Sequence, residues 1–207
     1  MKRHLMSAVF AVIGLFLCSS AQAQMYAGFS HGKLSGALSS NPCDLPFYTC
    51  SNDNDASIVR LGYKLPDSVF GHFWDHKIGT AIELSYARYS DLIVNGPMPP
   101  LSSARWDEKL RSVSIGTASE FPLTRNMSLV ARIGASFYRS TETLSQGTFS
   151  MTASERHTTE MYYGVGGIYR LNDKVALTGD LLISRAPFSR VSSREIHLLS
   201  AGLMYSF

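Results

Sequence analysis

The sequence predicts an all-β fold, a closed eight-stranded antiparallel β-barrel that spans a membrane, and three observations lead to this prediction. In the final ten residues, one parity carries Leu199, Ala201, Leu203, Tyr205 and Phe207, while the other is mostly small or polar. A strand with one apolar face and one small face suits a wall between lipid and a tight interior. The chain also begins like a secreted precursor, and its predicted connections alternate between long and short.

The first 23 residues have the features of a secretory signal peptide. A cationic start precedes an apolar run, Ala8 to Leu17, and an Ala-x-Ala site then predicts cleavage between Ala23 and Gln24. The run is shorter than the roughly 20 apolar residues that a membrane-spanning helix needs. The sequence therefore predicts a signal peptide over residues 1–23 and one barrel domain over residues 24–207.

Removal of this peptide leaves a nearly neutral chain, because loss of Lys2 and Arg3 lowers the basic residues from 19 to 17, against 16 acidic residues. This balance argues against nucleic-acid binding, which needs a strong basic excess. The two cysteines that remain, Cys43 and Cys50, are predicted to form a disulfide in an oxidising compartment. Two thiols are too few ligands for a metal site, and no cofactor is predicted.

Eight segments are predicted to be strands, and most have roughly the 9–11 residues that a tilted strand needs to cross a bilayer. In chain order they are Met25–Lys33, Ala56–Leu65, Lys77–Tyr89, Asp107–Glu120, Ser128–Arg139, Thr159–Arg170, Val175–Ser184 and Glu195–Phe207. An even number of strands places both termini on the same side of the membrane, which is the periplasmic side in an outer-membrane barrel.

The connections between these strands alternate in length. The long ones are residues 34–55, 90–106, 140–158 and 185–194, and the shorter ones are residues 66–76, 121–127 and 171–174. Outer-membrane barrels have long extracellular loops and short periplasmic turns. The sequence therefore predicts a bacterial outer-membrane location, with the long loops facing the exterior.

Aromatic residues on the lipid-facing parity are predicted to form two belts at the two membrane interfaces. The periplasmic belt comprises Tyr63, Tyr169, Tyr205 and Phe207, and the outer belt comprises Tyr86, Phe137 and Tyr163.

Four charged residues on the inward parity are predicted to share one layer of the barrel interior: Arg60, Glu83, Arg132 and Asp180. An ion in such an interior loses hydration and needs a partner, and two cations with two anions satisfy one another. An eight-stranded barrel is just wide enough for side chains to fill. Inward glycines at 62, 134, 164, 166 and 202 would make room for the longer side chains. A plugged interior is expected.

The order of several short motifs resembles the OmpA-like transmembrane-domain superfamily of small outer-membrane barrels, and more narrowly the accessory colonization factor type. The matching stretches are residues 82–86, 129–137 and 163–169, together with the C-terminal strand. The resemblance implies a terminal signal, formed by Leu203, Tyr205 and Phe207, that the outer-membrane insertion machinery reads. It implies no cell-wall anchor, because no peptidoglycan-binding domain follows the last predicted strand.

The function is expected to lie in the loops, since a rigid scaffold commonly displays binding residues there. We expect a monomer that contacts outer-membrane lipid and takes part in adhesion, colonisation or envelope interaction, with a host-surface or matrix ligand as candidate partner. The predicted last loop carries Arg185, Arg190 and Arg194. These arginines suit phosphates of lipopolysaccharide or sulfated glycans, but a solvated loop with scattered charge is the favoured explanation.

Two other functions are weighed against this one. A narrow passive pore for small solutes would need a continuous polar bore, which the predicted charge layer blocks. A lipid A-modifying enzyme would need a nucleophile and a base within reach, and His157 with Ser154 and Glu155 is the only candidate group at the predicted rim. We therefore expect no enzymatic activity.

Overall fold

The computed structural model describes residues 25–35, 49–51, 54–66, 72–73, 76–98, 101–146, 149–188 and 191–207. The predicted signal peptide and its cleavage site at Ala23 and Gln24 lie outside these residues, as does Cys43. No helix in the described part of the chain is long and apolar enough to cross a membrane.

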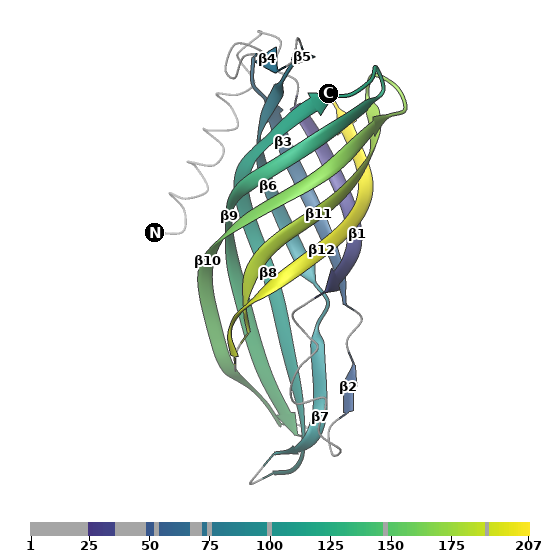
Figure 1. Cartoon of the computed structure of the whole chain (residues 1–207). Helices are drawn as coiled ribbons and strands as arrows, with labels where there is room; N and C mark the ends of the chain where they lie inside the picture. Colours follow the sequence, from purple (N-terminus) through teal and green to yellow (C-terminus); the bar gives the residue numbers. More distant parts are fainter. Residues whose placement is uncertain are drawn as a thin grey trace, which may run out of the picture.

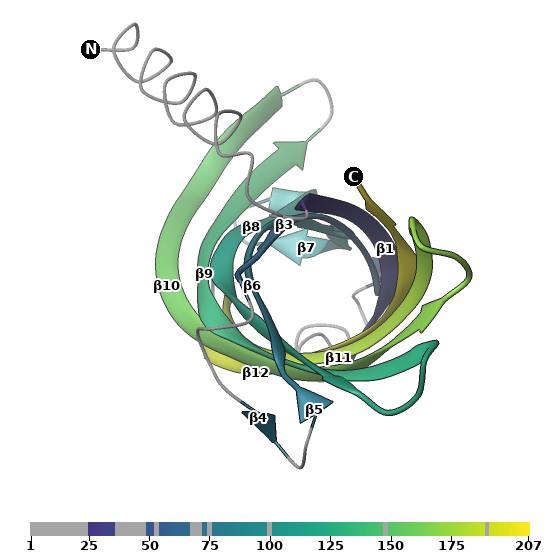
Figure 2. The ribbon, with the colours of Figure 1, turned by 90° about the horizontal axis from the view of Figure 1, so that it is seen from above.

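Eight antiparallel strands close into a barrel, which confirms the predicted fold (Figures 1 and 2). Each strand pairs with the next along the chain, and the first pairs with the last from Tyr26 opposite Ser206 to Ser35 opposite His197. The strands are β1 (Met25–Ser35), β3 (Asp55–Lys64), β6 (Gly79–Tyr89), β8 (Leu101–Pro122), β9 (Met127–Gln146), β10 (Phe149–Arg170), β11 (Val175–Phe188) and β12 (Val191–Ser206).

Four short strands were not predicted from the sequence. β7 (Leu92–Met98) pairs with β8 beyond the point where β6 ends, and β2 (Thr49–Ser51) pairs with β7. β4 (His72–Phe73) and β5 (His76–Lys77) pair with each other at the end of the predicted connection 66–76, and β5 takes Lys77, which was predicted to begin the third barrel strand. β2 and β7 lie at the lower end of the barrel in Figure 1.

Three strands are each eight to ten residues longer than predicted, and this is the main correction to the sequence analysis. β8, β9 and β10 have 22, 20 and 22 residues. The segment 140–158 was predicted to be a loop, yet β9 and β10 pair from Tyr169 opposite Met127 out to Phe149 opposite Gln146. Cross-strand hydrogen bonds satisfy the backbone N–H and C=O groups there, in a part of the strands that need not lie in lipid. Beyond lipid neither face must be apolar, so the alternation that marks a membrane strand fades.

The two short turns have side-chain caps that explain their tightness. The Thr124 hydroxyl accepts hydrogen bonds from the backbone N–H groups of Asn126 and Met127, at 3.4 and 3.1 Å. Asn172 Oδ1 accepts the N–H groups of Lys174 and Val175, at 2.9 and 2.8 Å. Such local side-chain acceptors favour turns. We call this end of the barrel the turn end and the opposite end, where β7 to β10 continue, the extended end.

The outward face of the barrel is a wide apolar surface. Large hydrophobic side chains such as Phe29, Leu61, Ile115, Ile133 and Val165 are exposed on it. A soluble protein does not expose so much contiguous apolar surface, so this face fits lipid. The predicted belt residues Tyr86, Phe137, Tyr163, Tyr169, Tyr205 and Phe207 are all exposed on it, whereas Tyr63 is half-buried.

The C-terminal residue lies at the seam that closes the barrel. The Phe207 N–H donates a hydrogen bond to the Met25 carbonyl at 2.9 Å, which joins the ends of β12 and β1. Its ring lies edge-on to that of Tyr205, with centroids 5.2 Å apart and an interplanar angle of 79°. Phe207 and Leu203 are exposed on the outward face.

Deletion of Phe207 is expected to lower insertion of the barrel into the outer membrane and to leave secretion intact. The deletion removes the exposed terminal ring and one seam hydrogen bond, while the rest of the closed sheet stays. Heat-modifiable migration of outer-membrane fractions measures the folded amount, with Phe207→Tyr as the matched control that keeps an aromatic ring. Wild-type levels of the folded band in the truncated protein would contradict a role for this ring.

Candidate functional site

Four buried ions meet in the middle of the barrel. The Arg132 Nε donates to Glu83 Oε2 at 2.9 Å, and its Nη1 donates to Asp180 Oδ1. The Arg60 Nη1 donates to Asp180 Oδ2 at 3.1 Å, and its Nε lies 3.6 Å from Glu83 Oε2. β3, β6, β9 and β11 each supply one side chain, and every one of them is at least nine-tenths buried. Each ion therefore contacts both ions of opposite charge.

Tyr26 adds a fifth member that the sequence analysis missed. Its hydroxyl donates to Glu83 Oε1 at 2.5 Å. The ring occupies the space over Gly62, its partner across β1 and β3, where any Cβ would overlap it. Only glycine leaves room for the ring at position 62. The inward parity of Tyr26 was readable from the sequence, but its contact with Glu83 requires the pairing of three strands.

Gly166 makes room for Asp180 in the same way. The two residues are direct partners across β10 and β11, and a Cβ at 166 would overlap the Asp180 carboxylate and the Gly179 carbonyl. The inward glycines are therefore part of the ion site, because they allow charged side chains to fit inside a narrow ring of strands.

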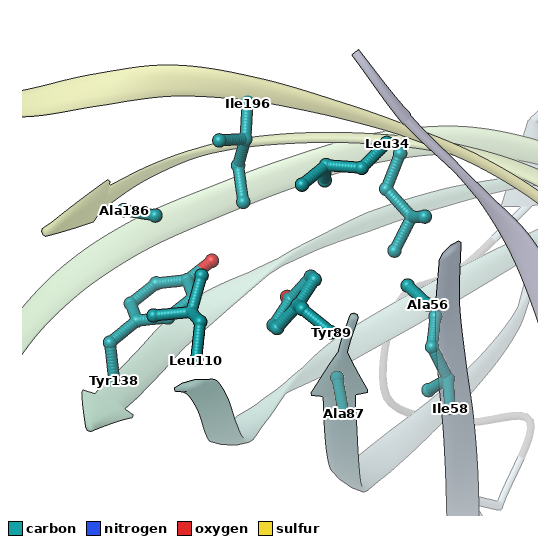
Figure 3. Packing of buried hydrophobic residues seen from close by; sticks show 10 residues of the cluster. Leu34, Ala56, Ile58, Ala87, Tyr89, Leu110, Tyr138, Ala186 and Ile196 are labelled. Atoms are coloured by element: carbon teal, nitrogen blue, oxygen red, sulfur yellow. The ribbon is translucent and has the colours of Figure 1, made fainter. Parts of the chain in front are cut away.

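Apolar layers close the interior on both sides of the ions. Toward the extended end lies a cluster of Leu34, Ala56, Ile58, Ala87, Tyr89, Leu110, Tyr138, Ala186, Ile196 and Leu198 (Figure 3). The Tyr89 and Tyr138 rings are 6.3 Å apart in this cluster. Toward the turn end lies a second cluster of Tyr26, Ala81, Ala118, Val130, Ile168, Ala176 and Met204. Buried serines, among them Ser112, Ser114 and Ser136, also lie on the inner wall, so the interior is filled by apolar packing together with polar and ion contacts.

Two small cavities flank the ion layer. One of about 40 Å³ lies between the ions and the Tyr89–Tyr138 cluster, and one of about 30 Å³ lies between the ions and the turn end. A single water needs at least about 10–15 Å³ of such space, so each cavity holds a few waters at most. Paired ions between two such cavities form a plug, because a passing solute would have to separate Arg132 from both of its acids.

The predicted basic loop is largely strand, which corrects that prediction. Arg185 lies in β11 with an exposed, outward side chain, and Arg194 lies in β12 with its backbone paired to Ala186. Arg190 lies outside the described residues, as does the side chain of Arg194. Pairing of β11 with β12 continues as far as Phe188 opposite Val191 and shortens the predicted loop.

The structure describes only some of the residues in the predicted disulfide and the predicted rim group. Cys50 lies in β2 opposite Val94, but its side chain and all of Cys43 lie outside the described residues, so the disulfide stays a prediction. His157 Nε2 contacts Glu155 Oε1 at 2.9 Å on the outward face of β10. Ser154 pairs with the buried Glu142 and is on the opposite face, so the structure does not bring it to His157.

Three outward-facing arginines in adjacent strands also went unnoticed in the sequence. Arg88 is directly opposite Arg111, and Arg111 is directly opposite Arg139. Each is two residues from an outward apolar side chain, namely Tyr86, Val113 or Phe137. That spacing was a usable signal within each strand, but only the register shows that the three cations adjoin.

Substitution of Arg132 by methionine is expected to lower the free energy of unfolding by about 3–5 kcal/mol, because Glu83 and Asp180 would lose a shared buried cation. The control is Lys33→Met, which breaks the exposed Lys33–Asp55 pair of 2.5 Å and should cost only about 0–1 kcal/mol. Urea titration of the lipid-reconstituted barrel, read by heat-modifiable migration, measures both. Equal effects of the two substitutions would show that the interior network is not a stabilising unit.

No protein-family model matches the sequence, and no curated protein is significantly similar to it. Among solved structures, Neisserial surface protein A is similar, with a TM-score of 0.55 and 16% identity over 89% of this chain and 97% of that chain. A major outer membrane protein from Thermus thermophilus is similar, with a TM-score of 0.55 and 10% identity over 90% of this chain and 100% of that chain. Membership of the accessory colonization factor type stays a prediction. The chain has the fold of the small outer-membrane β-barrels.

Proposed function

We propose that this protein is a non-conducting outer-membrane barrel whose extended end lies outside the cell and displays an adhesive β-sheet. One observation carries the proposal: β8, β9 and β10 continue as paired strands well beyond the level at which the outward apolar series ends. On β8 and β9 the outward apolar series ends near Val113 and Phe137, and on β10 Met151 is the one exposed large hydrophobic side chain described beyond Met161, yet β9 and β10 pair as far as Gln146 and Phe149. In Figure 1 this sheet projects below the barrel.

The projecting sheet has an open edge along β10. β10 pairs with β11 from Arg170 up to Tyr162 opposite Ser184, whereas β11 continues outward paired with β12 only, as at Arg185 opposite Glu195. Residues 149–161 therefore have β9 on one side and no described strand on the other. An open edge presents unpaired N–H and C=O groups, which an extended segment of another protein can take up by strand addition.

The side chains along this edge suit a reversible protein contact. Met151 and Met161 are exposed at its two ends, with Glu155, Arg156 and His157 exposed between them. Charged side chains on an edge oppose uncontrolled aggregation, while exposed methionine adapts to varied partners. A host-surface or matrix protein with an extended segment is the partner that this edge fits.

The plugged interior distinguishes the proposal from a passive pore. Purified protein in planar bilayers is expected to give no stable conductance steps, because the paired ions separate two cavities that each hold only a few waters, and packed side chains fill the interior beyond them. A wide porin added afterwards to the same bilayer verifies detection. Large, stable openings from this barrel alone would overturn the plug and favour transport.

Shortening the β9–β10 hairpin should abolish adhesion while the barrel still assembles. The variant replaces residues 143–153 by Asn-Gly, a two-residue turn that joins Glu142 to its partner Ser154. The control exchanges Leu144 and Met151, which are cross-strand partners, so length and composition are unchanged. Cells with equal amounts of folded protein are tested on an immobilised matrix extract. We expect binding to fall to that of cells lacking the protein only for the shortened hairpin; undiminished binding would refute adhesion through this sheet.

A further inference from the structure

Cations gather on the outward face just beyond the apolar band at the extended end. We call Arg88, Lys109, Arg111 and Arg139 the cation girdle; they lie on β6, β8 and β9, and their side chains are exposed. Lys33 on β1 and Arg185 on β11 are exposed, outward-facing cations at the same end of their strands. On β6, β8 and β9 the outward face thus changes from apolar to cationic within two residues.

The cations of the girdle are close together and poorly neutralised by the protein. Side chains directly opposite on antiparallel strands have Cβ atoms about 4.5–5.5 Å apart, and like charges in such pairs repel. Arg139 Nε contacts Glu155 at 2.7 Å, but Arg88, Lys109 and Arg111 have no ion pair or hydrogen bond within the described ranges of the chain. Arg88 and Arg111 therefore have no protein anion among the described residues, and Arg139 has only the exposed Glu155, so an anion from outside the protein would complete the neutralisation of this row.

A surface hollow joins the girdle to the lipid-facing surface. It has a volume of about 370 Å³ and is lined on one side by Lys109, Arg111 and Arg139, and on the other by Tyr86, Val113 and Phe137. The lining therefore combines cationic side chains with apolar and aromatic ones, and Ser112 and Thr141 complete it. A molecule that fills it must carry an anionic head next to a hydrocarbon tail.

The turn end has no equivalent arrangement. At that end the outward-facing strand residues of β8 and β9 include Phe121, Met127 and Leu129, and the exposed cation nearest to them along the chain is Arg125, in the turn itself. The two ends of the barrel therefore differ in charge. Among the described residues of β6, β8 and β9, a cationic rim lies at the extended end and not at the turn end.

We propose that the girdle binds a phosphorylated, multiply acylated glycolipid of the outer leaflet at this hollow. The Arg111 and Arg139 guanidinium groups take the phosphate, for which planar, two-pronged donors are well suited, and Lys109 adds a third positive charge. Val113 and Phe137 contact the acyl chains. The lipid is a boundary molecule held by the barrel wall, distinct from any partner of the β10 edge. The assignment to the outer leaflet rests on the orientation proposed above, whereas the binding itself does not.

Binding of diphosphoryl lipid A to the purified full-length barrel in detergent tests the site. The variant is Arg111→Gln with Arg139→Gln, and the control, Arg125→Gln with Lys174→Gln, removes the same charge from exposed residues of the turns. We expect the first pair to weaken binding at least about tenfold, as loss of a charge-assisted hydrogen bond does, and the control to bind like wild type. Equal affinities of the two variants would overturn the site.

Two further arms keep the result specific. Dephosphorylated lipid A should bind wild type as weakly as the phosphorylated lipid binds the variant, because only the acyl contacts remain. Inorganic phosphate should not compete, because it lacks the acyl chains that contact the apolar part of the hollow. Full competition would show a simple anion site and reject the lipid.

If the glutamine pair does not fold, the variant Arg111→Lys with Arg139→Lys replaces it, because it keeps both charges. This pair is expected to bind with intermediate affinity, and wild-type affinity would reject two-pronged recognition. None of these measurements depends on adhesion.

Discussion

Every backbone N–H and C=O group in the hydrocarbon of a bilayer must find its partner within the protein, and this constraint shapes the whole molecule. The eight strands meet it by closing on themselves, with β1 paired to β12 and β8 to β9. A ring of only eight strands encloses a space that side chains fill. The apolar side chains that suit lipid point outward, so the interior receives the small and polar half of each strand.

Charged side chains inside the barrel lose their hydration, and the interior compensates by pairing equal numbers of positive and negative groups. Arg60 and Arg132 each contact both Glu83 and Asp180, so no buried ion depends on one partner. Tyr26 supplies one more donor to Glu83, and glycines at 62 and 166 provide the space. Because side chains fill the bore, we propose that the barrel contacts other molecules through the wall near the headgroups and the sheet beyond them.

The sequence was informative wherever lipid imposes alternation and less so elsewhere. The inward parity of Arg60, Glu83, Arg132 and Asp180 is legible because one face of each membrane strand is apolar, and the structure brings all four together. The extension of β9 and β10 could not be predicted from such alternation, since residues 140–158 are largely polar on both faces. The Tyr26–Glu83 contact and the arginine row depend on cross-strand register, which a single sequence does not reveal.

The ion layer also has a consequence for how the chain reaches its native state. Arg60 and Asp180 are 120 residues apart in the chain, and Arg132 and Asp180 are 48 residues apart, yet all three meet in one cluster. Topologies dominated by such distant contacts fold slowly, because chain entropy is lost before the contacts form. A half-built ring would leave carboxylates and guanidinium groups unmatched in a dehydrated space. Completion of the ring is therefore cooperative, and partly assembled intermediates are disfavoured until the last strand arrives.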